Sequence, residues 1–188
     1  MKDIILGVLN DYLLLFPEEK DRQSIFIKYL NSHNNSEITD WNNFDGHIVS
    51  SGFIYAKEDK KFLVLYHKDL KMFLYPGGHI DKKDDNPLDA AKREVIEETG
   101  ITDFEQLKII DNILVPIDID THKVAYNERL KLPEHFHFDF RYLFIVNSIC
   151  NVIIDKEEAD NYKWINMDQL NFGKVTDKII KLLYNIEK

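Results

Sequence analysis

The chain lacks the features that mark several classes of protein. Its 188 residues include a single cysteine, Cys150, so no disulfide can form within the chain, as in most cytosolic proteins. Lys and Arg form no run and the formal net charge is −9, which argues against a track for a long nucleic acid. No stretch reaches the ~20 apolar residues that a membrane-spanning helix needs. We therefore expect a cytoplasmic protein with neither a membrane nor a long nucleic acid as its partner.

Two apolar stretches could be mistaken for something else. Cys150 ends the apolar run YLFIVNSIC, where a packed, inert thiol is expected rather than a nucleophile. The first residues, MKDIILGVLNDYLLLF, are interrupted by Asp3, Asn10 and Asp11, and no small-residue cleavage site follows them. We therefore do not expect them to act as a secretory signal.

The length of the chain suggests one domain, or one domain with an extension. Apolar residues recur at helical spacing up to about residue 34, and Pro17 divides them into two short helices. The polar stretch SHNNSEITDWNN, residues 32–43, has the composition of a linker. We therefore predict an N-terminal helical extension, residues 1–44, followed by a main domain, residues 45–188.

The main domain begins with a change of pattern. β-branched and aromatic residues predict strands, with a hairpin turn at KEDK, residues 57–60. Pro87 near its start and Gly100 as its stop predict a helix at 87–99, and an amphipathic pattern predicts a last helix at 176–186. The predicted strands are 47–56, 61–68, 72–75, 107–115, 138–149 and about 161–166. Strands covered by two or more helices indicate an α/β or α+β sandwich.

The most unusual stretch of the predicted helix is REVIEETG. Its i, i+3 and i+4 spacing places Glu94, Glu97 and Glu98 on one face, beside Arg93, which could hold a carboxylate by a bidentate pair. Buried carboxylates repel one another and lose hydration, so such a cluster calls for a cation, and Mg²⁺ or Mn²⁺ suits oxygen ligands. A solvated acidic face is the plain alternative. It does not explain the Pro-Gly-Gly turn, the Asp-rich loop and the final glycine that accompany the glutamates.

In this order the residues resemble the Nudix box of diphosphate hydrolases. Gly78 matches the first glycine of the box, and residues 93–101 match its second half. The first glutamate of the box falls on Asp84 or Asp85, in a loop that is one residue longer than usual. The opening MFLYPGGHID also resembles members whose box begins Gly-Gly-His-x-Asp, and WINMDQL, residues 164–170, resembles a late strand of the family.

This resemblance implies a Nudix-like α/β/α sandwich with a mixed β-sheet, in the α/β class. It also implies a metal-dependent hydrolase that cleaves a diphosphate linkage in a nucleoside diphosphate derivative or a similar small molecule, with Mg²⁺ or Mn²⁺. A homodimer is an arrangement common among such proteins. The implied metal ligands are Glu94, Glu97, Glu98 and a carbonyl of Gly77 or Gly78. The implied catalytic residues are Arg93 and the same glutamates, with Glu94 or Glu98 as the base. Glu157 or Glu158 would complete the site.

A second cluster, HFHFDFRY at residues 135–142, alternates strictly. If it is a strand, its aromatic residues point one way, and His135, His137, Asp139 and Arg141 point the other. This row is either the wet face of an amphipathic strand or part of a substrate cleft with His79, in which Arg141 meets phosphate and the histidines assist or bind metal.

Two further predictions concern the neighbours of this row. A zinc site from His135, His137 and His79 or His122 is an alternative, although no spacing demands it. Asp118, Asp120 and His122, in PIDIDTH, also alternate, but a hydrated loop is the expected role for these three.

Two other functions fit less well. A non-catalytic Nudix-like sensor of a nucleotide metabolite would not need the metal-ligand residues that this chain keeps. A diphosphate isomerase of the same superfamily uses a cysteine beside the opening glycine, where this chain has Pro76-Gly77-Gly78. No aromatic residue stands out as a platform for a base, since Trp41, Tyr75, Tyr126 and Trp164 fit the core or the rim equally well.

Overall fold

The computed structural model describes residues 1–126, 128 and 131–186. Its N-terminal part forms α1 (Lys2–Leu15), the short 3-10 helix η1 (Pro17–Glu19) and α2 (Ser24–Ser32). Proline has no N–H to continue a helix and its ring clashes with the preceding turn, so α1 ends before Pro17. The two predicted helices and the break between them are confirmed.

The N-terminal helices pack onto the main domain. The ring of Phe26 stacks on that of Phe138 with 4.6 Å between centroids, and Ile5 and Val8 belong to the same buried cluster as Ile54. Burial of apolar surface is the main stabilising contribution to folding, so the helices share a core with the sheet. The division of the chain at residues 44 and 45 into extension and domain stays a prediction.

Eight strands form one mixed sheet among the described residues. Its main path runs β3-β2-β1-β7-β5, with β4 paired to β1, β6 to β7 and β8 to β2. β1 and β7 are parallel and the other pairs are antiparallel. The strands are β1 (His47–Ala56), β2 (Lys61–His67), β3 (Met72–Leu74), β4 (Gly77–His79), β5 (Glu105–Gln106), β6 (Asp118–Val124), β7 (His135–Val146) and β8 (Ala159–Asn166).

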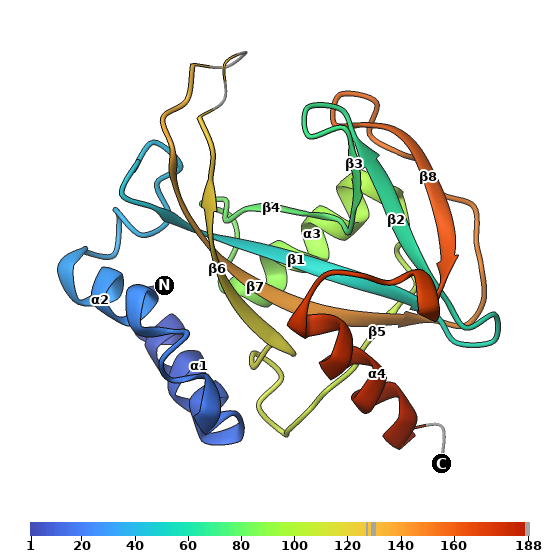
Figure 1. The fold of residues 1–188 in the computed structure, drawn as a ribbon, viewed down its shortest axis with the longest axis horizontal. Coiled ribbons are helices and arrows are strands. Elements are labelled where there is room, and N and C mark those ends of the chain that lie inside the picture. Colours follow the sequence, from blue (N-terminus) through green and yellow to red (C-terminus); the bar gives the residue numbers. More distant parts are fainter. Residues whose placement is uncertain (127, 129–130, 187–188) are drawn as a thin grey trace.

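Two helices cover opposite faces of this sheet (Figure 1). On β1, Ile54 packs in one buried cluster with Val95 of α3 (Pro87–Thr99), whereas its neighbour Phe53 packs in a second cluster with Ile179 of α4 (Lys174–Ile186). Successive side chains of a strand point to opposite faces, so this alternation separates the two helices. The remaining element is the 3-10 helix η2 (Met167–Gln169). The predicted α/β/α sandwich with a mixed sheet is confirmed.

The helix that bears the glutamates has the predicted bounds. Asn86 precedes it and accepts a hydrogen bond from the Asp89 N–H, Pro87 is its first residue, and Gly100 follows it with φ 68°. An Asn cap, an initial proline and a left-handed glycine are strong signals for the ends of a helix. The predicted helix at 87–99 is therefore confirmed.

Two predictions on the apolar segments are wrong. Residues 107–115 form no strand: β5 ends at Gln106, and Asn112 accepts hydrogen bonds from the N–H groups of Leu114 and Val115, which turns the chain. Their apolar side chains fill the core from a loop. Cys150 is exposed rather than packed, because β7 ends at Val146 and the apolar run continues past the sheet. None of the described helices combines the length and the apolar character needed to cross a bilayer.

Candidate active site

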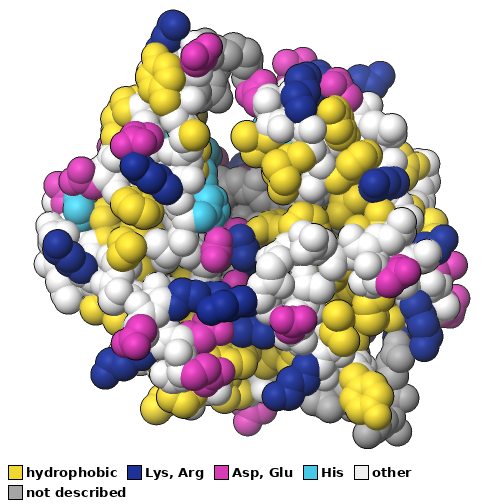
Figure 2. All heavy atoms as spheres, viewed as in Figure 1, with side chains coloured by type: hydrophobic (Ala, Val, Ile, Leu, Met, Phe, Trp, Pro, Cys, Tyr) yellow, Lys and Arg dark blue, Asp and Glu magenta, His cyan; other side chains and the backbone are white. Residues whose placement is uncertain are grey.

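An open cleft of about 1300 Å³ lies over the first half of β1. One edge of α3, the strand β4 and the polar faces of β6 and β7 line it, together with residues 36–42 that lead into β1. Figure 2 shows a hollow in this part of the surface, with histidine side chains beside it. The cleft therefore joins the two clusters that the sequence singled out.

At one end of the cleft the box glutamates face the two glycines that begin β4. Glu98 accepts a hydrogen bond of 2.7 Å from the Gly77 N–H. Glu94 lies so close to Gly78 that a Cβ added there would stand 2.6 Å from its Oε1 atom. Both glutamates are buried, at 8% exposure, whereas the Glu97 side chain is 48% exposed. The glycine pair thus lets the backbone approach the two buried carboxylates.

Burial disfavours the ionised form of these two carboxylates. It raises the pKa of Glu94 to about 7 and the pKa of Glu98 to about 8, and the negative charge of Glu158 adds to both shifts. A desolvated carboxylate without enough donors favours its neutral form. A cation between the two groups would restore the charged form, which is the property expected of a metal site.

Arg93 holds several carboxylates at once. Its Nη1 atom lies 2.8 Å from Glu94 and 2.7 Å from Glu97, and its Nη2 atom lies 2.9 Å from Asp84. Nη2 also donates a hydrogen bond of 2.7 Å to the His79 carbonyl. A guanidinium offers five N–H donors in a fixed plane, so one side chain can position all of these groups.

The same contacts show which aspartate of the longer loop lies at the site. Asp84 is buried, accepts from Arg93 and also accepts a 2.7 Å hydrogen bond from the Asp81 N–H. Asp85 is exposed. Of the two aspartates, Asp84 is therefore the one that contacts Arg93.

At the other end of the cleft, five histidines gather. His47 of β1 pairs with His137 of β7 in the sheet, and His79 of β4 follows two residues further along β1, opposite Val49. The Nε2 atoms of His79 and His47 are 3.0 Å apart, and those of His135 and His137 are 3.1 Å apart. His122 adds its ring 5.5 Å from that of His137. Sequence reasoning missed His47, because only the register of β1 places it here.

The polar row of β7 contributes His135 and His137 to this group of histidines. The alternation of HFHFDFRY is confirmed: Phe138 and Phe140 lie in the core, while His137, Asp139 and Arg141 line the cleft. His135 does not line it and is buried against the ring of His47, 4.9 Å away. The interpretation as a solvent-exposed face is therefore wrong, because His135, Asp139 and Arg141 are buried; a role of this row in binding substrate stays a prediction.

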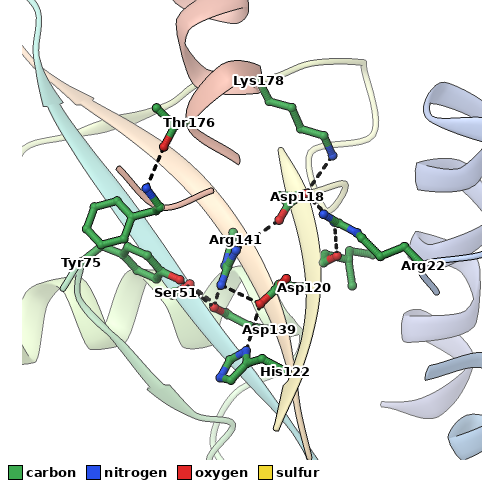
Figure 3. Close-up of polar contacts among 12 residues, drawn as sticks. Arg22, Ser51, Tyr75, Asp118, Asp120, His122, Asp139, Arg141, Thr176 and Lys178 are labelled. Carbon is green, nitrogen blue, oxygen red and sulfur yellow. Dashed lines mark hydrogen bonds and ion pairs between the residues drawn. The ribbon is translucent and has the colours of Figure 1, made fainter. Parts of the chain in front are cut away.

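Arg141 lies among three aspartates (Figure 3). Its Nε is 2.9 Å from Asp139, its Nη2 is 2.9 Å from Asp120 and its Nη1 is 3.3 Å from Asp118. Ser51 also donates a 2.7 Å hydrogen bond to Asp139. Because the guanidinium is shared by three carboxylates, it fixes β6 against β7 in addition to bordering the cleft.

The expected hydrated loop at 118–122 is wrong. These residues begin β6, and Asp118 is fully buried, with Arg22 at 2.6 Å and Lys178 at 2.8 Å. A buried carboxylate is stable only when cations and donors compensate it, and here they come from the N-terminal and C-terminal parts of the chain. Asp120 and His122 line the cleft, 3.0 Å from one another.

Comparison with known proteins identifies the family. The NUDIX domain family matches residues 46–184 of this chain, which include β1, the box helix and α4. The chain belongs to the Nudix family. The match begins after the N-terminal helices, so α1 and α2 lie outside it.

Several relatives resemble this Nudix chain in sequence. A probable DHNTP pyrophosphohydrolase of Lactococcus lactis is 35% identical over 125 residues, which cover 66% of this chain and 69% of the relative. An RNA pyrophosphohydrolase of Bartonella bacilliformis is 32% identical over 111 residues, covering 56% of this chain and 64% of the relative. The prediction of a Nudix-type pyrophosphohydrolase, an enzyme that acts on acid anhydrides, is confirmed by the family and these relatives.

Solved structures agree on the fold. A NUDIX-family hydrolase from Clostridium perfringens superposes with a TM-score of 0.58 at 25% identity, covering 74% of this chain and 97% of that one. A C. elegans Ap4A hydrolase superposes with a TM-score of 0.55 at 22% identity, covering 73% and 98%. The likeness to the second structure concerns the fold alone.

The remaining residues singled out in the sequence lie around the Nudix cleft. Glu157 and Glu158 both line it, and Glu158 acts electrostatically on Glu94 and Glu98. Trp41 and Tyr75 also line it, and the exposed Trp41 ring stands edge-on to His79 with 5.8 Å between centroids. Tyr126 is exposed and Trp164 packs against the core. The Gly-Gly-His-x-Asp subgroup stays a prediction.

Proposed function

We propose that this Nudix chain hydrolyses a diphosphate linkage in a nucleoside diphosphate derivative or a similar small phosphorylated molecule, with Mg²⁺ or Mn²⁺. The observation that carries the proposal is the pair of buried carboxylates, Glu94 and Glu98, which lie against the two glycines of β4 with Arg93 beside them. Two carboxylates that share a buried site and have few donors suit a divalent cation better than any other partner.

The donor set fits a hard cation. Glu94, Glu97, Glu98 and the Gly78 carbonyl would hold it, because carboxylate and carbonyl oxygens are the ligands that Mg²⁺ and Mn²⁺ prefer. The absence of a side chain at Gly78 supports this, since a Cβ there would fill the space beside Glu94. Such an ion neutralises the charge of a diphosphate and lowers the pKa of a water molecule.

The side chains divide the work at the box end of the cleft. Arg93 keeps Glu94 and Glu97 in place, and its contact with the His79 carbonyl fixes β4 relative to α3. A carboxylate with a pKa near 7 can accept a proton from water at neutral pH, which makes Glu94 and Glu98 the two candidates for the base. Glu158 acts electrostatically on both and is the candidate for a further carboxylate.

The other end of the cleft would receive the rest of the substrate. His79, His137, Asp139 and Arg141 line it, and His135 lies behind them. Acidic groups outnumber Arg141 in this part of the cleft and would repel a free anion. They therefore favour a substrate whose negative charge is screened by metal at the box end. The exposed Trp41 ring offers an apolar wall to a flat group.

A hydrolysis assay tests the proposal. Purified protein should release phosphate products with Mg²⁺ or Mn²⁺ from some member of a panel that includes DHNTP, RNA, Ap4A and ADP ribose, the compounds that the names of similar proteins mention. Glu98→Gln should lower turnover roughly 10²- to 10⁴-fold. Glu105→Gln, at an exposed glutamate outside the cleft, should keep full turnover and is the matched control.

Two outcomes would reject hydrolysis at this site. Equal turnover in wild type and Glu98→Gln would remove the box carboxylates from the reaction. Binding without turnover over the whole panel would favour the non-catalytic sensor instead. A homodimer and a cytoplasmic location stay predictions, and size-exclusion chromatography with light scattering would test the first.

A further inference from the structure

At the histidine end of the cleft, three of the described side chains lie close enough together to bind one metal ion. One nitrogen from each of His47, His79 and His137 lies within 4.8 Å of the other two. None of the three belongs to the carboxylate set proposed for Mg²⁺. The sheet fixes their backbones, since β1 pairs with β4 on one side and β7 on the other.

The spacing of two of these nitrogens is close to that around a bound ion. Zn–N bonds of ~2.05 Å in a tetrahedron place neighbouring nitrogens ~3.3 Å apart. The Nε2 atoms of His47 and His79 are 3.0 Å apart. A shift of a few tenths of an ångström would therefore let these two rings share one ion.

The outer nitrogens of the cluster are anchored as metal-binding histidines require. His47 Nδ1 lies 3.3 Å from the Asn43 carbonyl, and His135 Nδ1 lies 2.8 Å from the Pro133 carbonyl. A carbonyl accepts only, so each Nδ1 carries its hydrogen there and each Nε2 presents a lone pair to the cluster. Of the three residues within metal-binding distance of one another, His47 thus presents its lone pair inward, whereas His135 packs beside His137.

The surroundings keep the rings neutral, which ligation requires. Burial, together with the neighbouring histidines, lowers the pKa of His47 to about 4 and the pKa of His137 to about 2. Among the described residues, the hydrogen-bond partners of these two rings and His79 are imidazoles and one backbone carbonyl. A set of nitrogen donors selects a borderline ion of the Zn²⁺ class over Mg²⁺.

We propose that His47, His79 and His137 form a second metal centre, for a Zn²⁺-class ion, built from side chains other than the box carboxylates. His79 and His137 border the cleft, whereas His47 is buried behind them at 1% exposure. Three protein ligands leave the fourth position of a tetrahedral ion open, and here that position faces the cleft. An oxygen of water or of a bound substrate can occupy it. The proposal does not rest on the hydrolytic function.

The test uses the full-length protein, freed of metal, and Co²⁺ as a spectroscopic probe for Zn²⁺. Wild type should bind one Co²⁺ with the intense visible bands of a tetrahedral ion, and Zn²⁺ should displace it. His137→Gln and His79→Gln should each weaken Zn²⁺ affinity on the order of 100-fold, a loss at least as large as that for removing an outer-shell partner. His79 is exposed, so His79→Gln keeps the test valid if His137→Gln fails to fold.

Two controls separate this centre from other sites. His33→Gln changes a histidine of the N-terminal part that lies outside the cleft, and it should leave Zn²⁺ affinity unchanged. Glu98→Gln should also leave the visible bands unchanged, even if it abolishes turnover. Equal Zn²⁺ affinity in wild type and both cluster variants, a Co²⁺ spectrum of an octahedral ion only, or bands that vanish in Glu98→Gln would each overturn the proposal.

Discussion

The two ends of the cleft are built in opposite ways. At the box end, Glu94 and Glu98 come from one helix and Arg93 directly precedes Glu94 in sequence. At the histidine end, His47 and His137 come from strands that are 90 residues apart and meet only through parallel pairing. A helix places functional groups by local spacing, whereas a sheet places them by register. Only the first kind of site can be read along the chain.

The two ends also differ in what holds their charge. Carboxylates and a guanidinium face one another at the box end, so each group depends on a partner of opposite charge. Among the described residues, the rings of His47 and His137 form no ion pair with a carboxylate, and they stay neutral. Removing one partner should therefore affect stability more at the box end.

Arg93→Gln gives the largest expected effect on stability. It leaves Asp84 and Glu94 buried without their cation, which should lower the free energy of unfolding by about 3 kcal/mol in metal-free protein. Arg93→Lys should recover only part of this, since an ammonium group cannot reproduce the fork. Urea unfolding measures both.

The control for Arg93 is its exposed partner. Glu97→Gln removes a carboxylate whose side chain is 48% exposed, and it should change the free energy of unfolding by less than about 1 kcal/mol. A loss in Glu97→Gln as large as that in Arg93→Gln would show that the exposed pair, and not the buried carboxylates, depends on the arginine.

Gly78→Ala should affect turnover more than stability. The added Cβ would stand 2.6 Å from Glu94 Oε1, and because this atom is the end of a flexible side chain it can move aside. Displacing a metal ligand by about 1 Å lowers the rate roughly 100-fold. We therefore expect about this loss in kcat with a nearly unchanged Tm.

Gly7→Ala is the matched control for the glycine substitution. No atom lies within 4 Å of a Cβ placed at Gly7, which sits inside α1. It should raise stability by about 0.5–1 kcal/mol and leave kcat unchanged. Unchanged kcat in Gly78→Ala would mean that the space beside Glu94 is not used in the reaction.

The accuracy of the sequence predictions follows the same division between local and non-local signals. The box helix was predictable to the residue, because Pro87 and Gly100 mark its ends and the glutamates share a face by spacing alone. The alternation in β7 was predictable from spacing as well, but its ends were not, since the strand predicted at 138–149 is His135–Val146. Arg93 was placed beside Glu97 correctly, but its contact with Asp84 depends on how the longer loop folds back.

The errors arose where distant parts of the chain decide the outcome. Asp118 was expected in a hydrated loop, because nothing near it in sequence compensates its charge; Arg22 and Lys178 do so from both ends of the chain. The apolar residues around Ile109 looked like a strand, yet a turn at Asn112 places them in the core as a loop. The place of His47 in the cluster could not be predicted from the sequence. A single histidine at the start of a strand joins a site only through the neighbours that the sheet gives it.

The two ends should also act in opposite directions on the pH dependence of stability. In metal-free protein the pKa of Glu98 is raised from 4.5 to about 8, so its neutral form stabilises the fold below pH 4.5, and this contribution is lost as pH rises to 8. The pKa of His47 is lowered from 6.5 to about 4, so its contribution is present above pH 6.5 and is lost as pH falls to 4.

Thermal unfolding of metal-free protein between pH 4 and pH 9 separates the two trends. Glu98→Gln should flatten the decline between pH 5 and pH 8 and leave the decline below pH 6.5 in place, whereas His47→Gln should do the reverse. Saturating Mg²⁺ should oppose the first decline, because a bound cation favours the ionised carboxylate. If one substitution flattened both declines, the two ends would titrate as a single coupled cluster. The carboxylates of the helix and the imidazoles of the sheet would then not contribute independently to stability.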